Sequence, residues 1–237
     1  MLFAAAAVVA ACSPMAVQRA GQPPMDFSGP RLEGDRFVSF DGAKLGLSHW
    51  APSDEPWAVI VGVHGMNDYA NAFHLAGPWW AGQGVATYAF DQRGFGRSPQ
   101  RGVWGGGLMV EDLRTLVALV RAEHPHAIIA VAGESMGGAV AIEAFASDRP
   151  PNADRLILLS PAVWGWSHQP LPYKTALWMA ARFTAAKVYT PPSWVAGCVK
   201  PTDNRQELVA MGRDPLMVWG ARSDTLYSLV SLMDRAS

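Results

Sequence analysis

Residues 133–137 read GESMG, a G-x-S-x-G pattern that can carry a nucleophilic serine. They follow the apolar run 127–132, which predicts a strand, and they open an apolar helical pattern that begins at Met136. A serine on a tight turn between strand and helix projects its hydroxyl from the sheet edge, and the flanking glycines permit that turn without Cβ clashes. We therefore predict that Ser135 is a nucleophile. The alternative is a plain glycine-rich connection between strand and helix.

Acyl-transfer chemistry at such a serine also needs two backbone N–H donors aimed at the developing oxyanion. One is expected from Met136, which follows the serine, and the other from the loop 64–68, which follows the apolar run 57–63. His64 opens this loop. We expect it to be a buried histidine that holds the turn through hydrogen bonds rather than the catalytic base.

The composition argues against several other kinds of site. The 237 residues include 19 basic and 20 acidic ones, for a net charge of −1, so no nucleic-acid footprint is expected. Segment 91–98 fails as a dinucleotide-binding G-x-G-x-x-G because Pro99 occupies the last position, and no phosphate-binding G-x-x-x-x-G-K-[ST] occurs. His124 and His126 precede a buried strand and are expected to be loop residues. We predict neither a cofactor nor a metal.

Apolar strand-like runs alternate with helical patterns along the chain, which is typical of a doubly wound α/β sheet. The predicted strands are an opening hairpin and four apolar runs, at 36–40, 45–50, 57–63, 84–90, 127–132 and 155–159. The predicted helices lie at 110–120, 136–146, 174–187 and 223–235. We assign 35–160 to this α/β core. From 161 to 237 the alternation stops, and the Trp-rich helical stretches there predict a cap.

The N-terminal residues are expected to be a processing signal. Residues 1–12, MLFAAAAVVAAC, form an uncharged apolar run of secretory length that is too short to span a bilayer as a helix. The end of this run resembles a bacterial lipoprotein lipobox, which implies cleavage before Cys12, lipidation of its thiol and anchoring at the periplasmic side of the cell envelope. Alternatives are an ordinary signal peptide with a chance cysteine, and a cytoplasmic protein if the signal does not function. Residues 13–34 are rich in Pro and Gly and predict a flexible tether.

Three segments together resemble the α/β-hydrolase superfamily: HGMNDYA (64–70), DQRGFGRS (91–98) and GESMGG (133–138). They are most similar to its monoacylglycerol lipase and lysophospholipase branch, which is grouped with the serine aminopeptidase-like hydrolases. Residues 202–217 resemble the cap segment of that branch. The resemblance implies a mostly parallel sheet with the cap inserted after the sixth strand. It also implies roles for single residues: Ser135 as nucleophile, the backbone N–H groups of Met66 and Met136 as the oxyanion hole, and His64, Gly65, Gly133 and Gly137 as supporting residues.

A serine nucleophile needs a histidine base and an acid that orients it, and in this fold the acid and then the histidine follow the serine. The only histidine after Ser135 is His168, at the start of the cap. The family carries its acid after a seventh strand and its histidine after an eighth, and the sequence reaches Ser237 before either. We therefore expect a truncated hydrolase without the last two strands, with 155–159 as an uncovered edge, poorly soluble and inactive. The alternative is a degenerate protein that uses His168 or has no catalysis.

The leading functional hypothesis is a serine hydrolase that cleaves esters of lipid-like substrates, monoacylglycerols or lysophospholipids, through an acyl-enzyme on Ser135. The Trp-rich cap suits an acyl chain or a membrane interface, and a lipid anchor would hold the enzyme at a membrane surface. A first alternative is an aminopeptidase-type hydrolase, with Glu134 and Asp68 as candidate carboxylates for a free amine. A second is a non-catalytic lipoprotein that binds lipids.

Overall fold

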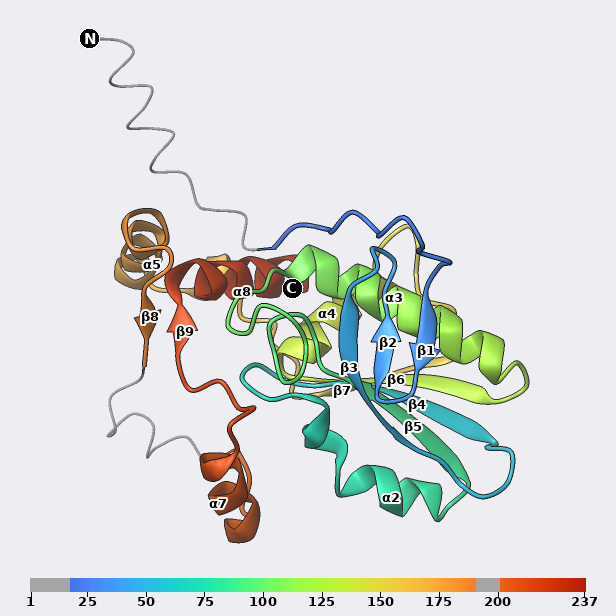
Figure 1. The fold of residues 1–237 in the computed structure, drawn as a ribbon. Coiled ribbons are helices and arrows are strands. Elements are labelled where there is room, and N and C mark those ends of the chain that lie inside the picture. The colour runs from blue at the N-terminus through green and yellow to red at the C-terminus, as the bar shows by residue number, and fades with distance from the viewer. Residues whose placement is uncertain (1–17, 191–200) are drawn as a thin grey trace.

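The computed structural model describes residues 18–190 and 201–237, and a seven-stranded sheet forms its centre (Figure 1). The strands lie in the order β1-β2-β3-β5-β4-β6-β7. Their bounds are Arg31–Glu33 (β1), Arg36–Val38 (β2), Lys44–Trp50 (β3), Ala58–Val63 (β4), Val85–Phe90 (β5), Ile128–Glu134 (β6) and Arg155–Leu159 (β7). The last four of these pair in parallel, and the first three join the sheet antiparallel. The predicted mostly parallel α/β sheet is confirmed. It begins at Arg31, inside the segment that the sequence assigned to the tether.

Helices cover both faces of this sheet. Their bounds are Ala70–Phe73 (η1), Ala76–Ala81 (α2), Gly106–Glu123 (α3), Met136–Phe145 (α4), Trp166–His168 (η2), Leu171–Phe183 (α5), Arg205–Arg213 (α7) and Ser223–Arg235 (α8). The short helices η1 and α2 pack on one face, and α3 and α4 pack on the other (Figure 1). This double covering explains why the central strands are apolar on both sides, as parallel sheets require.

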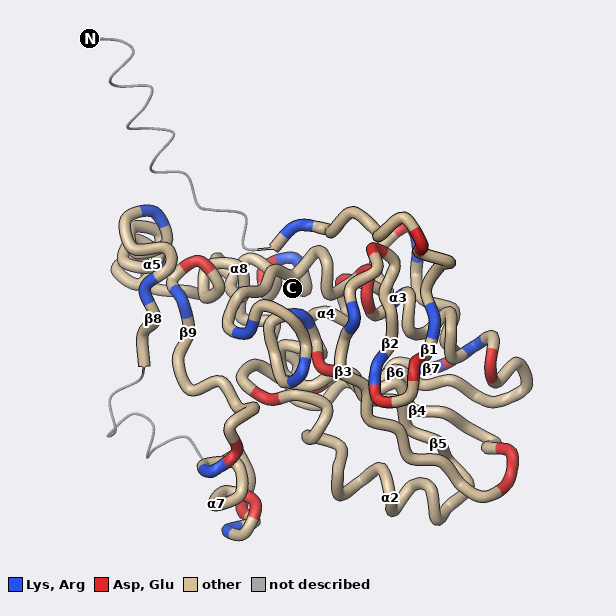
Figure 2. The backbone as a smooth tube through the Cα atoms, viewed as in Figure 1, with Lys and Arg blue, Asp and Glu red and all other residues tan. Residues whose placement is uncertain are grey.

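The middle of the sheet holds the buried core. Every position of β5 is buried, and the valines of β4 at 59, 61 and 63 have no exposed surface. Figure 2 shows the central strands β4 and β5 without charge, while Lys, Arg, Asp and Glu lie on the outer strands, loops and helices around them. Gly62 of β4 lies under the ring of Phe73, where a Cβ would come within 2.8 Å of the ring carbons. The backbone of β4 and η1 can therefore approach each other closely.

The region after Ser160 differs in detail from the predicted cap. Helix α5 begins at Leu171 rather than 174, because Pro170 precedes it and Pro172 presets the helical φ in its first turn. Two short strands, Val188–Tyr189 (β8) and Ala221–Arg222 (β9), pair with each other. Helix α8 was assigned to the cap, but it packs on α3 and α4 of the core as well as on α5. It therefore joins the core to the cap.

Among the described residues strand β7 is one edge of the sheet, as expected for 155–159, and β1 is the other. Ile157, Leu158 and Leu159 are 41%, 39% and 46% exposed, whereas Ile129 and Val131 of the neighbouring β6 have no exposed surface. A strand of large apolar residues with an unpaired edge is a template for pairing with another chain. Within the described residues no element covers this edge.

Candidate active site

Ser135 stands alone between the last residue of β6 and the first of α4. Its φ of +49° and ψ of −115° lie in a range that favours glycine and costs on the order of 1–3 kcal/mol for other residues. The backbone around it fixes this conformation: the Ser135 N–H donates to the Leu159 carbonyl at 3.0 Å, and the Ala162 N–H donates to the Ser135 carbonyl at 2.9 Å. The predicted strand–turn–helix geometry is present, and its strain is maintained by neighbouring segments.

Glycines on both sides of Ser135 allow the turn to close. A Cβ on Gly133 would lie 2.7 Å from the Gly137 carbonyl oxygen, and one on Gly137 would lie 2.6 Å from the His64 carbonyl oxygen. The loop after β4 therefore rests directly on the start of α4. Gly65 of that loop comes close to the serine, since a Cβ on Gly65 would lie 3.3 Å from the Ser135 Cβ.

Two backbone N–H groups beside the serine have no partner. Within residues 18–190 and 201–237, neither the Met66 N–H nor the Met136 N–H makes a hydrogen bond. Met136 is fully buried and is the first residue of α4, whose N-terminal N–H groups carry partial positive charge. Met66 is only half-buried, and N–H groups at the start of a helix have no intrahelical partner. Both donors are therefore free to bind an oxygen that carries negative charge.

His64 is buried, and its two ring nitrogens have different partners. The Gln92 N–H donates to Nε2 at 2.9 Å, so this nitrogen accepts, and Nδ1 therefore carries the proton and donates to the Gly65 carbonyl at 2.7 Å. Burial lowers the pKa of His64 to about 4, so the ring is neutral at pH 7. Both ring nitrogens are engaged in holding the loop, which leaves none to accept a proton from Ser135. The side chain of Gln92 donates to the His64 carbonyl at 2.7 Å, a pairing that the sequence analysis missed.

Carboxylates gather on the other side of this loop. Burial, together with the nearby charges of Glu134 and Asp214, raises the pKa of Asp68 to about 6. Asp214 accepts a hydrogen bond of 2.7 Å from the Tyr69 hydroxyl, and the Asn67 carbonyl accepts one of 3.0 Å from the Val218 N–H. The segment after α7 is thus bound to the loop after β4. From the sequence, Asp214 was placed only within the cap-like segment 202–217, and Tyr69 had no predicted role.

Within the described residues no basic side chain forms a hydrogen bond with the Ser135 hydroxyl. His168, the alternative candidate, is exposed at the end of η2, and its Nδ1 lies 2.9 Å from the Ser167 hydroxyl. Neither a histidine nor a carboxylate hydrogen-bonds the Ser135 hydroxyl in the part of the chain that the structure describes. Cys12, the predicted lipidation site, and Cys198 lie outside the described residues.

Two other features, a metal-ligand cluster and a membrane-spanning helix, are absent from the described residues. They contain no cluster of three or more His, Cys, Asp or Glu side chains that could hold a metal ion. None of their helices combines the length and the apolar character needed to cross a membrane.

The family model of the serine aminopeptidases, S33, matches residues 54–237. The chain belongs to this family. A monoacylglycerol lipase from Mycolicibacterium smegmatis is 33% identical over 129 residues, which cover 54% of this chain and 46% of that protein. A monoglyceride lipase from Rattus norvegicus is 30% identical over 128 residues, which cover 53% and 42%. The chain spans less than half the length of these relatives.

Solved structures show the same fold as this S33 member. A soluble variant of monoglyceride lipase from Saccharomyces cerevisiae, solved with a substrate analogue, has a TM-score of 0.68 at 19% identity. The match covers 92% of this chain and 72% of that one. A monoacylglycerol lipase from Paleococcus ferrophilus has a TM-score of 0.59 at 21% identity and covers 81% and 71%. The chain is therefore an α/β-hydrolase of the monoacylglycerol lipase-like branch, as its motifs predicted.

Proposed function

We propose that this chain carries the nucleophile of a serine ester hydrolase. The observation that supports it most strongly is the strained backbone of Ser135 beside two unpaired N–H groups. In the proposed reaction the Ser135 Oγ attacks the ester carbonyl carbon, and the carbonyl oxygen accepts hydrogen bonds from the Met66 and Met136 N–H groups. The serine proton passes to a base, the alcohol leaves, and water then cleaves the acyl-enzyme to a carboxylic acid.

We propose further that the 237-residue chain turns over slowly. A serine hydroxyl is a weak nucleophile at neutral pH without an adjacent base. His64 cannot supply one, because its Nε2 is occupied by the Gln92 N–H and burial depresses its pKa. His168 is exposed and is bonded to its neighbour. The Ser135 turn and the two N–H groups orient the ester carbonyl, but they do not remove the proton from the serine hydroxyl.

Chemical rescue tests both parts of this proposal. The chain is incubated with p-nitrophenyl decanoate, with and without imidazole as an external base, and intact-protein and peptide mass spectrometry follow the decanoyl adduct. We expect a slow adduct on Ser135 that imidazole accelerates at least tenfold. The Ser135→Ala variant should give none. Adduct formation is measured rather than nitrophenol release, because imidazole itself hydrolyses the ester in solution.

Two results would count against the proposal. An adduct that forms equally in Ser135→Ala places the nucleophile elsewhere and favours a non-catalytic lipid-binding protein. Ser135-dependent turnover at 1–10³ per second without imidazole, roughly the usual enzymatic range, shows that the chain has a base of its own.

The lipid-like substrate class is supported by the relatives, which are monoacylglycerol and monoglyceride lipases. One observation favours the aminopeptidase-type alternative: the carboxylates of Glu134 and Asp214 lie near that of Asp68, Glu134 adjoins Ser135, and carboxylates suit a free amine. The two are separated by comparing adducts from p-nitrophenyl decanoate and from the p-nitrophenyl ester of alanine under the same rescue. We expect faster acylation by decanoate. Faster acylation by the alanine ester would establish the alternative.

We also propose that Cys12 is lipidated and anchors the protein at the cell envelope. The proposal is supported by the apolar run 1–12 and its lipobox-like end. Mass spectrometry of protein expressed in a bacterial host with its own N-terminus decides it: we expect a mature chain that begins at a diacylated Cys12. A chain that retains Met1 or an unmodified thiol would contradict the proposal.

A further inference from the structure

Two cavities lie along the contact between α5 and α8, away from the residues around Ser135. Their volumes are about 500 Å³ and about 520 Å³, and both have Trp166 and Lys174 in their walls. Both cavities are open to solvent, with Tyr173 and Trp178 well exposed, and each volume is within the roughly 300–1,000 Å³ range of pockets that hold small ligands. Ser135, Met66 and Met136 line neither cavity. These cavities thus offer a site separate from the proposed oxyanion hole.

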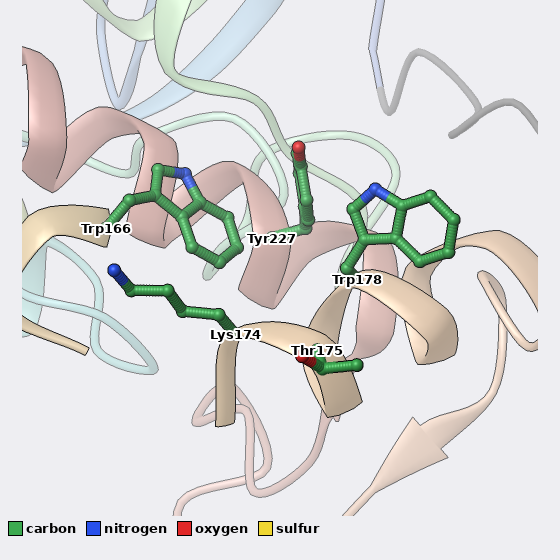
Figure 3. Close-up of a pocket in the computed structure, with 5 residues that line it drawn as sticks. All are labelled: Trp166, Lys174, Thr175, Trp178 and Tyr227. Atoms are coloured by element: carbon green, nitrogen blue, oxygen red, sulfur yellow. The ribbon is translucent and has the colours of Figure 1, made fainter. Parts of the chain in front are cut away.

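The walls of the two cavities are largely apolar. Trp178 and Tyr227 line the first, and Leu177 and Leu226 are among the residues that line the second. Figure 3 shows the rings of Trp166 and Tyr227 on the same side of the first cavity, and their centroids are 4.8 Å apart. The Trp166 indole N–H donates to the Ser231 hydroxyl at 3.1 Å, so its polar atom is already satisfied. The remaining surface suits a hydrocarbon chain.

Basic residues lie on one side of α5, where Lys174 lines both cavities and Arg182 lines neither. Lys174, Trp178 and Arg182 follow one another at four-residue spacing, so they share one side of α5. Figure 3 shows the Lys174 ammonium extending past the Trp166 ring, and the Arg182 guanidinium carbon lies 3.9 Å from the Trp178 ring centroid. In the described residues neither cation forms a salt bridge, and the buried Arg182 Nη1 has no hydrogen-bond partner. Arg222 of β9 is already paired with Asp224 at 2.6 Å.

We propose that the α5–α8 cavities bind a single-chain fatty acid. Its carboxylate pairs with Lys174, which the two cavities share, and its hydrocarbon chain lies against Leu177 and Leu226 of the second cavity. An apolar wall beside Lys174, which forms no salt bridge in the described residues, is complementary to one negative charge on one acyl chain. Binding requires no chemistry at Ser135, so the site goes beyond the proposed hydrolase function and does not depend on it.

Ligands with the same chain and different head groups test this site. Dodecanoate, dodecanol and dodecyltrimethylammonium are titrated, below their micellar concentrations, into the full chain, and tryptophan fluorescence and calorimetry report binding. We expect dodecanoate to bind at least fivefold more tightly than dodecanol, and the cation to bind more weakly than both. Decanoate should bind roughly fifteenfold more weakly than dodecanoate, since each of the two missing methylenes changes affinity about fourfold.

Variants then locate the site. Lys174→Met should lower the affinity for dodecanoate about fivefold and leave dodecanol within twofold, because only the charge pairing is lost. Arg213→Met, at the exposed end of α7 and outside both cavities, is the matched control and should change neither. Ala176→Trp, in the wall of the second cavity, should weaken both ligands alike. Ser135→Ala should bind dodecanoate as the parent chain does.

Three outcomes would overturn the proposal. They are no binding of dodecanoate to the parent chain, equal affinity for the acid and the alcohol, and an unchanged preference for the acid in Lys174→Met. The first two are measured on the unmodified chain, so they do not depend on whether a variant folds. Circular dichroism of each variant shows that the fold is retained.

Discussion

The turn at Ser135 and the edge strand β7 lie side by side in the same sheet and differ in how they are packed. At the turn two backbone segments are in direct contact, and a methyl group at position 137 would clash with them. On β7, Ile157 and Leu159 are more than two-fifths exposed, although they are large and apolar. The candidate site is therefore fixed by close contacts within the chain, whereas the edge of the sheet is held by pairing on one side only. Substitutions at the two places should have very different effects.

The most costly substitution is expected next to the candidate site, at Arg93. Its guanidinium is buried and donates to Asp41 at 2.7 and 2.9 Å and to Asp112 at 2.6 and 2.8 Å. Arg93→Met would leave two buried carboxylates without their cation, which should lower the free energy of unfolding by about 3–5 kcal/mol. Urea denaturation measures this. Arg149→Met, which removes an exposed pair with Glu111, is the control and should cost less than about 1 kcal/mol.

A smaller loss of stability is expected when one methyl group is added at the turn. Gly137→Ala would place a Cβ against the carbonyls of Val63 and His64, and overpacking of this kind costs about 1–3 kcal/mol. The displaced loop should also slow imidazole-rescued acylation of Ser135. Gly107→Ala in α3 is the matched control: nothing lies within 4 Å of its Cβ, and removing glycine from a helix should add up to about 1 kcal/mol. Equal stability of the two variants would contradict the packing argument.

The contrast between the two regions also explains what could be predicted from sequence. The turn is encoded locally, because a strand, a G-x-S-x-G pattern and a helix are adjacent in the chain, and Ser135 adopts the expected strained conformation. The parallel strands were predictable for a similar reason, since burial on both faces makes each run apolar over its whole length. The polar loop after β5 was not predicted to bind a nucleotide, and Arg93 anchors it through Asp41 and Asp112.

Contacts between distant segments were not predictable. The attachment of α8 to α4 joins residues 92 positions apart, as in the ion pair of Arg235 with Glu143, and helical periodicity alone does not reveal the partner of an apolar face. The Tyr69–Asp214 hydrogen bond spans 145 positions. The pairing of β8 with β9 involves two residues in each strand, too few for a period-2 pattern to emerge.

Asp68 allows the electrostatics of the loop to be tested. Its pKa of about 6 in the folded protein exceeds its usual value of 3.8, so the folded state binds this proton more tightly than the unfolded state. The free energy of unfolding should therefore fall as the pH rises from about 4 to about 6, and it should stay lower above that range. Asp68→Asn retains the oxygen that accepts from the Tyr69 N–H and should be more stable at pH 7 by about 1–2 kcal/mol.

Denaturation of Asp68→Asn between pH 4 and pH 7 should show a flatter dependence than the parent chain. Asp148→Asn, at an exposed carboxylate after α4, is the matched control for removal of one charge. If Asp68→Asn is destabilised at pH 7, the carboxylate has a favourable partner and the proposed crowding of negative charge is wrong.

A substitution on β7 is expected to have the smallest effect on stability. It should have the largest effect on self-association. Ile157→Lys places a charge on the exposed edge strand, where lysine discourages pairing with another chain, and it should change the free energy of unfolding by less than about 0.5 kcal/mol. Sedimentation velocity should show that the parent chain self-associates and that the variant does so less. Ile128→Lys adds the same charge at a 44% exposed position of β6, away from the edge, and should leave association unchanged. A parent chain that stays monomeric at tens of micromolar would show that the exposed apolar edge is not sufficient for pairing.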